Sequence, residues 1–153
     1  MQEDFDGALE IMEDVLEINK RQKNYSSAAT TLNNIAGVYV RMDQVDKALK
    51  PLEEAAQYYE KSGYKVGEAF AYNNLGILTK KIGEKEKSLE YRLKSLDIYK
   101  SINNEVGIAS AYLALATFYH EENNDKKALE FALKAEEIYS RIEKLDKQVE
   151  LNL

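Results

Sequence analysis

The chain has 153 residues, no cysteine, a single proline and a formal net charge of -6. The lack of cysteine excludes disulfides, thiolate catalysis and cysteine zinc sites, and it fits a reducing, cytoplasmic location. An acidic chain without a basic stripe argues against nucleic acid as a partner, because phosphate contacts need clustered Lys and Arg.

The sequence repeats itself with a period of 40 residues and without gaps. The pairs in one such series are Ala8-Leu9, Ala48-Leu49, Ser88-Leu89 and Ala128-Leu129. A second series consists of Ala29, Ala69 and Ala109. Small residues at fixed columns favour the close approach of neighbouring backbones, so each period predicts one packed structural unit.

Each period contains two helical patterns. Leu32, Ile35, Ala36 and Tyr39 lie at i, i+3, i+4 and i+7, which is one face of a helix. Residue types that adopt the left-handed conformation after a helix predict where helices end, namely Asp43, Gly63, Gly83, Asn103 and Asn123. The predicted helices span 5–22, 25–42, 46–62, 66–82, 86–102, 106–122 and 126–142. A short helix is expected from Asp146, and Pro51 predicts a late start or a bend in the third helix.

These patterns resemble the tetratricopeptide repeat. The residues that carry the resemblance are Tyr72, Asn74, Leu75 and Gly76, followed after a turn by Ser88 and Ser95. The resemblance covers essentially the whole chain. The common repeat of this family has about 34 residues, so a 40-residue period implies longer helices. This 40-residue variety is similar to repeats in bacterial signalling and regulatory proteins.

The resemblance implies an all-α fold, a right-handed solenoid of stacked antiparallel helix pairs with about seven helices. One domain, residues 1–153, would then contain a half repeat at 5–24 and repeats at about 25–64, 65–104 and 105–144. Residues 146–153 would begin a further helix. Several tyrosines in helical columns, Tyr139 among them, are expected in the core.

In such a fold the first helix of each repeat lines the concave face, and the resemblance places Asn34 and Asn74 there. A carboxamide both donates and accepts hydrogen bonds, so it can bind the backbone of an extended peptide. Helical spacing adds further candidates on the same face, namely Asn33, Asn73, Phe70, Ile77, Arg41, Lys80, Lys81 and Leu113. The expected ligand is a protein or peptide segment with an acidic residue near Arg41, Lys80 and Lys81. An apolar residue is expected near Phe70, Ile77 or Leu113.

Each of these candidates also has a plain structural interpretation. The asparagines could form a solvated polar face, and Phe70 could pack against the neighbouring hairpin. The three cations could be solvated helix ends that interact favourably with the helix dipole. His120, the only histidine, lies near Glu121, Glu122 and Asp125, which make a weak ligand set for a metal.

The sequence argues against an enzyme and indicates no cofactor or metal. It contains no glycine-rich phosphate loop, nucleophile elbow or His-Glu-x-x-His motif. The longest apolar run, Ile108 to Tyr119, is too short to cross a bilayer, so no membrane role is expected. The leading hypothesis is an interaction scaffold from a larger signalling or regulatory protein, including a ligand-responsive sensor segment.

The alternative is a self-assembly module that stacks end to end into a homo-oligomer. Its contacts would involve Phe5, Met12 and Leu16 at one end of the chain and Ile138, Ile142 and residues 149–153 at the other.

Overall fold

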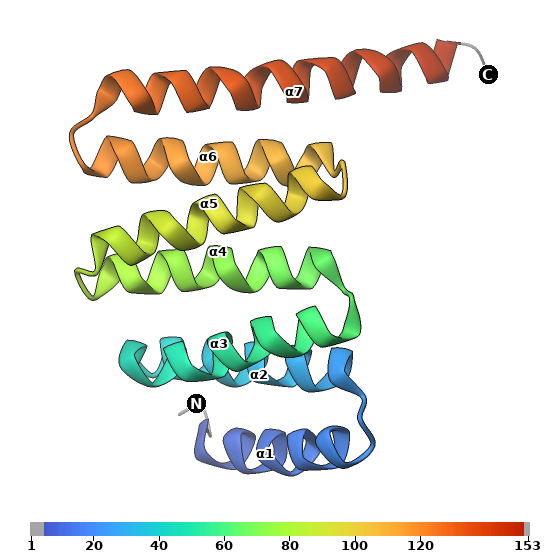
Figure 1. Ribbon diagram of the computed structural model, residues 1–153, viewed down its shortest axis with the longest axis vertical. Coiled ribbons are helices and arrows are strands. Elements are labelled where there is room, and N and C mark those ends of the chain that lie inside the picture. The colour runs from blue at the N-terminus through green and yellow to red at the C-terminus, as the bar shows by residue number, and fades with distance from the viewer. Residues whose placement is uncertain (1–4, 152–153) are drawn as a thin grey trace.

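A computed structural model describes residues 5–151, with side chains described for residues 5–148. Within these residues the chain forms seven helices and no strand. The helices are α1 (Phe5–Arg21), α2 (Tyr25–Arg41), α3 (Val45–Ser62), α4 (Lys65–Lys81), α5 (Lys85–Ser101), α6 (Glu105–Glu121) and α7 (Asp125–Leu151). They stack in chain order from α1 at one end to α7 at the other (Figure 1). This is the predicted all-α solenoid.

The helices form an inner and an outer layer. Each helix packs against its neighbours in the sequence, and α4 also contacts α6 directly. The even-numbered helices α2, α4 and α6 therefore share one side of the stack, here called the inner side, which the family resemblance predicts to be concave. The odd-numbered helices form the outer side. The division of the chain into a half repeat and three full repeats stays a prediction.

One left-handed residue ends each of the first six helices. These residues have φ values between 52° and 85° and occur every 20 positions, at Lys23, Asp43, Gly63, Gly83, Asn103 and Asn123. The sequence predicted five of them and missed Lys23, because lysine carries no turn signal. Each helix and its turn thus take 20 residues, so a 40-residue period contains one antiparallel pair.

The small-residue columns are close contacts between helices. Ala29, Ala69 and Ala109 have no exposed surface. At Gly76, an added Cβ would lie 2.8 Å from Cγ of Arg92 and 3.2 Å from the Ser88 carbonyl oxygen. The Ser88 hydroxyl donates a 2.6 Å hydrogen bond to the Gly76 carbonyl oxygen, so this buried hydroxyl has a partner. The predicted close approach of paired helices is therefore confirmed.

The last helix differs from the prediction. The expected end near residue 142 and new start at Asp146 are wrong, because α7 continues without a break to Leu151. The position one period after Gly63 and Asn103 holds Glu143, which lies inside the helix. Lys147 and Glu143 instead form an i,i+4 ion pair of 2.6 Å that supports the helix. Residues 152 and 153 lie outside the described part. The late start predicted for α3 is also wrong, since α3 begins at Val45 and includes Pro51.

At the two ends of the stack, the exposed apolar side chains differ from those predicted for end-to-end contacts. Phe5, Met12 and Leu16 pack against a cluster that contains Ile35 and Val38 of α2. The exposed apolar residues of α1 are instead Ile11, Val15 and Ile18. On α7 they are Leu129, Leu133, Tyr139 and Leu145, so the prediction of a buried Tyr139 is wrong. No helix follows α7 within the described residues to cover this surface.

Candidate functional site between neighbouring repeats

Each inner helix exposes one stripe of side chains to the concave face. The exposed residues of these stripes include Thr30, Asn34, Gly37 and Arg41 on α2, Phe70, Ile77 and Lys81 on α4, and Ser110, Leu113, Thr117 and Glu121 on α6. Their spacing of three or four residues follows one face of a helix. Phe70 is half exposed, so part of its ring is open to a ligand.

A cavity of about 250 Å³ lies between the inner helices α2 and α4. We call it the first inter-repeat site, and it is lined by Asn33, Ala36, Gly37, Val40, Leu52, Asn74, Ile77 and Leu78. Leu52 of the outer helix α3 is buried and contributes to an apolar lining. Gly37 leaves room, since an added Cβ would have no atom within 4 Å. The site therefore combines a mostly apolar lining with two carboxamides.

The structure brings Asn33 and Asn74 together, whereas the sequence had paired Asn34 with Asn74. Consecutive residues of a helix point about 100° apart, so Asn33 and Asn34 cannot face the same neighbour. Asn33 lines the cavity toward α4, and Asn34 is exposed outside it. Asn74 lines the same cavity from α4 and forms no hydrogen bond with another described residue. Its amide is thus available to a ligand.

Asn33 is held in place by an outer helix. Its Nδ2 donates a 3.1 Å hydrogen bond to the Tyr59 hydroxyl of α3, which also lies 3.2 Å from Oγ1 of Thr30. Oδ1 of Asn33 is enclosed and has no hydrogen-bond partner in the described structure. The Asn33 amide is therefore oriented, which leaves Asn74 as the more adaptable of the two.

The three predicted cations do not gather at one place. The Lys80 ammonium pairs with Glu122 and lies 4.7 Å from the centre of the Phe118 ring. The Arg41 guanidinium lies 5.3 Å from the centre of the Phe5 ring, toward α1. Lys81 is exposed at the end of α4. These residues therefore do not form the cationic cluster that the sequence suggested, because the first two are directed to different neighbours.

The sequence reasoning missed a buried arginine. Arg92 of α5 is 5% exposed and donates a 2.9 Å hydrogen bond from Nη1 to the Ala114 carbonyl oxygen of α6. Its guanidinium lies 6.0 Å from the centre of the Phe118 ring. Burial lowers the pKa of Arg92, and the nearby Glu121 carboxylate opposes this shift. The sequence does contain a signal for this residue: Arg92 is the one charged residue in a repeat column that otherwise holds the apolar Met12, Leu52 and Ala132.

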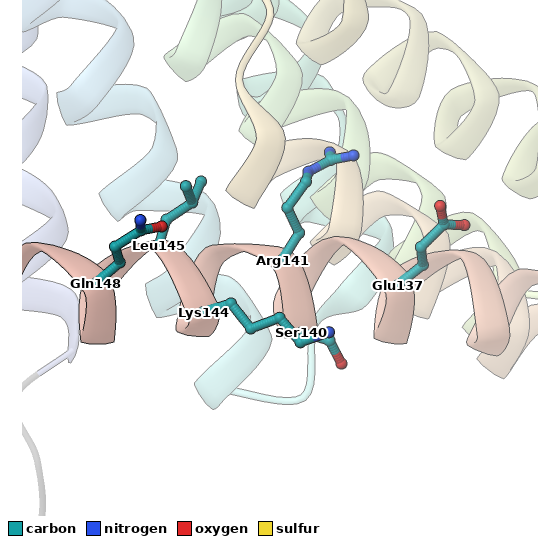
Figure 2. A pocket seen from close by; sticks show the side chains of 6 residues that line it. All are labelled: Glu137, Ser140, Arg141, Lys144, Leu145 and Gln148. Atoms are coloured by element: carbon teal, nitrogen blue, oxygen red, sulfur yellow. The ribbon is translucent and has the colours of Figure 1, made fainter.

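The remaining candidates offer little chemistry. Nδ1 of His120 lies 3.0 Å from Oδ1 of Asp125, which explains this histidine as a contact across the turn. Among the described residues, no three metal-binding side chains come together. A hollow of about 350 Å³ on α7 is lined by Glu137, Ser140, Arg141, Lys144, Leu145 and Gln148. Figure 2 shows that this lining comes from one helix, so it is an open surface and not a site between repeats.

Comparison with known proteins gives one family. The family model described as tetratricopeptide repeat matches residues 1–61, 27–101 and 67–141. No curated protein matches the sequence. Within the described residues, no helix is both long and apolar enough to cross a membrane.

Solved structures share the fold at low identity. BtubC from P. vanneervenii has a TM-score of 0.77 and 20% identity, covering 91% of this chain and 58% of that one. Aspartyl phosphate phosphatase F from Bacillus subtilis has a TM-score of 0.64 and 17% identity, covering 88% and 44%. The TPR domain of Arabidopsis FLU has a TM-score of 0.63 and 22% identity, covering 76% and 95%. The chain thus spans about half the length of the first two structures.

Proposed function

The chain belongs to the tetratricopeptide repeat family, and we propose that it is an interaction scaffold that binds an extended peptide segment on its concave face. The observation that carries this proposal is the first inter-repeat site, with its apolar lining beneath Asn33 and Asn74. Binding, and not catalysis, is the activity that such a surface supports.

The dimensions of the site favour a peptide side chain. A cavity of about 250 Å³ is smaller than the roughly 300–1,000 Å³ of sites that enclose a whole small molecule. An aliphatic side chain would fill it against Leu52, Ile77 and Leu78. The Asn74 amide would then bind the peptide backbone beside that side chain, donating to a carbonyl oxygen or accepting from an N–H group.

The setting that we infer is a larger signalling or regulatory protein in the cytoplasm. One observation supports a module within a larger protein. The chain covers 58% of BtubC and 44% of aspartyl phosphate phosphatase F, so similar solenoids occur within longer proteins. Solenoids also flex along their length, because each repeat contacts only its neighbours. A peptide bound between two repeats would therefore bias the curvature of the stack and act on a flanking domain.

A library of random twelve-residue peptides displayed on phage tests the binding proposal without knowledge of the natural partner. Peptides selected on the chain are labelled, and their affinities are measured by fluorescence anisotropy. Gly37→Leu would fill the first inter-repeat site and is expected to weaken binding at least tenfold. Glu90→Leu adds the same side chain at an exposed position of α5 and is expected to leave the affinity unchanged. Equal affinities of the unmodified chain, Gly37→Leu and Glu90→Leu for the selected peptides would overturn the proposal.

Self-assembly through the ends of the stack is a second candidate function. Ile11 is 67% exposed and Ile18 is 52% exposed on α1, and Leu129 is 61% exposed on α7. Analytical ultracentrifugation over a hundredfold range of concentration tests this candidate. A monomer throughout that range would exclude it. An oligomer that Ile11→Glu or Leu129→Glu dissociates would support it.

A further inference from the structure

The 40-residue period gives a set of residues equivalent to the first inter-repeat site, which we call the second inter-repeat site. Adding 40 to each residue of the first site gives Asn73, Gly76, Ile77, Lys80, Arg92, Ala114, Thr117 and Phe118. The observed contacts bring members of this set together, since Arg92 reaches Ala114, Phe118 and the space beside Gly76. Arg92 thus takes the place that Leu52 has in the first site. One of two equivalent sites is apolar at this position, and the other carries a cation.

The Arg92 guanidinium keeps unused hydrogen-bonding capacity. Of its five N–H donors, one Nη1 donor is used by Ala114 and the Nε donor makes a long 3.4 Å contact with the Ser88 hydroxyl. The Nη2 group donates to no residue of the described chain. Nη2 is also not among the fully enclosed side-chain atoms without a hydrogen-bond partner, so it still has contact with solvent.

No carboxylate of the described residues forms an ion pair with Arg92. Glu121 lies near enough to interact electrostatically, and Lys80 pairs with Glu122, which also pairs with Lys85. A cation that is mostly removed from water and lacks a counter-ion is unfavourable, and an anion that binds it would relieve that cost. Glu121 is exposed on the same stripe of α6 as Leu113 and Thr117, so the groups of α6 that lie near the guanidinium include an exposed residue of the inner side.

We propose that Arg92 makes the second inter-repeat site a subsite for an acidic side chain of the bound peptide. This inference rests on the proposed function. Neighbouring helices lie about 8–10 Å apart, and an extended peptide advances about 3.3 Å per residue. The acidic residue therefore lies about three residues from the aliphatic side chain that fills the first site. Arg92, carried by an outer helix, takes the role that the sequence had assigned to Arg41, Lys80 and Lys81.

The peptide library tests this inference with a register-matched substitution. Peptides selected on the unmodified chain are expected to contain an aliphatic residue and, about three residues away, Asp or Glu. Each selected peptide is compared with its Glu-to-Gln counterpart on the unmodified chain and on Arg92→Leu. Charged hydrogen bonds predict that the Gln peptide binds the unmodified chain about 10- to 100-fold more weakly. The Arg92→Leu protein is expected to bind both peptides equally.

Two further variants separate this role from a structural one. Arg92→Met keeps the length of the side chain without its charge, and it should also lose the discrimination between Glu and Gln. Glu121→Gln changes an exposed residue and should strengthen binding of the Glu peptide, because it removes a competing carboxylate. Full discrimination by folded Arg92→Leu or Arg92→Met, or no acidic preference on the unmodified chain, would overturn the inference. A loss of all binding on Gly37→Leu, with no acidic preference, would leave the proposed function intact and reject only this subsite.

Discussion

The Arg92 guanidinium of α5 donates a 2.9 Å hydrogen bond to the Ala114 carbonyl oxygen of α6. Through this bond, the charged group of an outer helix is held against an inner helix. It passes beside Gly76, where an added Cβ would lie 2.8 Å from Cγ of Arg92. The missing side chain at Gly76 and the long side chain at Arg92 are therefore parts of one arrangement.

Replacing Arg92 by leucine should leave the free protein as stable as before, or more stable by up to about 2 kcal/mol. Exchanging a buried charge for an apolar side chain is often neutral or stabilising, and Leu52 already occupies the equivalent position. Urea unfolding followed by circular dichroism measures the change. A loss of more than about 2 kcal/mol would mean that Arg92 is needed for the fold itself.

Asn74→Ala should weaken peptide binding about three- to tenfold, the effect of losing one hydrogen bond. Asn34→Ala serves as its matched control, since Asn34 has the same column in the preceding repeat and lies outside the first inter-repeat site. Isothermal titration calorimetry with a selected peptide compares the two. Equal losses of affinity in both variants would contradict the assignment of the site.

Gly107→Ala should destabilise the protein by about 1–3 kcal/mol, the usual cost of overpacking a core. Its new Cβ would lie 2.2 Å from a ring carbon of Tyr99, which packs over this glycine. Gly37→Ala is the control, because its Cβ meets no atom within 4 Å. Alanine favours a helix over glycine by about 1 kcal/mol, so this control should gain stability. Thermal unfolding measures both, and a stable Gly107→Ala would show that Tyr99 can move aside.

Lys23→Gly should stabilise the chain by about 1 kcal/mol. Lys23 has a φ of 55° at the end of α1, a conformation that costs a residue with a Cβ roughly 1–2 kcal/mol. Gly63→Ala, with a φ of 71° in the turn one 40-residue period later, should lose a similar amount. Differential scanning calorimetry of the two variants gives the comparison. Changes of the same sign in both would contradict this explanation of the turns.

Sequence patterns predicted the helices because the repeats reinforce one another. Three aligned copies specify the same buried alanines, and they place left-handed turns at the same positions, so chance agreement is excluded. The end of α7 was mispredicted because the repeat implied a turn near residue 143, where Glu143 replaces the left-handed Gly63 and Asn103 of the earlier periods. Exposure of Tyr139 was missed for a related reason, since its column is buried only where a further helix follows.

The site was predicted less well than the fold. Asn33, Asn74 and Ile77, which helical spacing placed on one face, all line the first inter-repeat site, but spacing could not decide which asparagine faces which neighbour. That choice depends on the rotation of each helix against the next one. Arg92 was missed because it belongs to an outer helix, whose side chains were not expected to reach the inner face. Its length and the absence of a side chain at Gly76 make that reach possible.

Amide chemical shifts measured by NMR during titration with a selected peptide test most directly whether the first inter-repeat site binds a ligand. We expect the largest changes at Gly37, Val40, Asn74 and Ile77, with smaller ones near Ala114. Amides of α1 and of the second half of α7 should stay unchanged. Changes centred on the exposed apolar residues of α1 or α7, with none at Gly37 or Asn74, would contradict a binding site between the repeats.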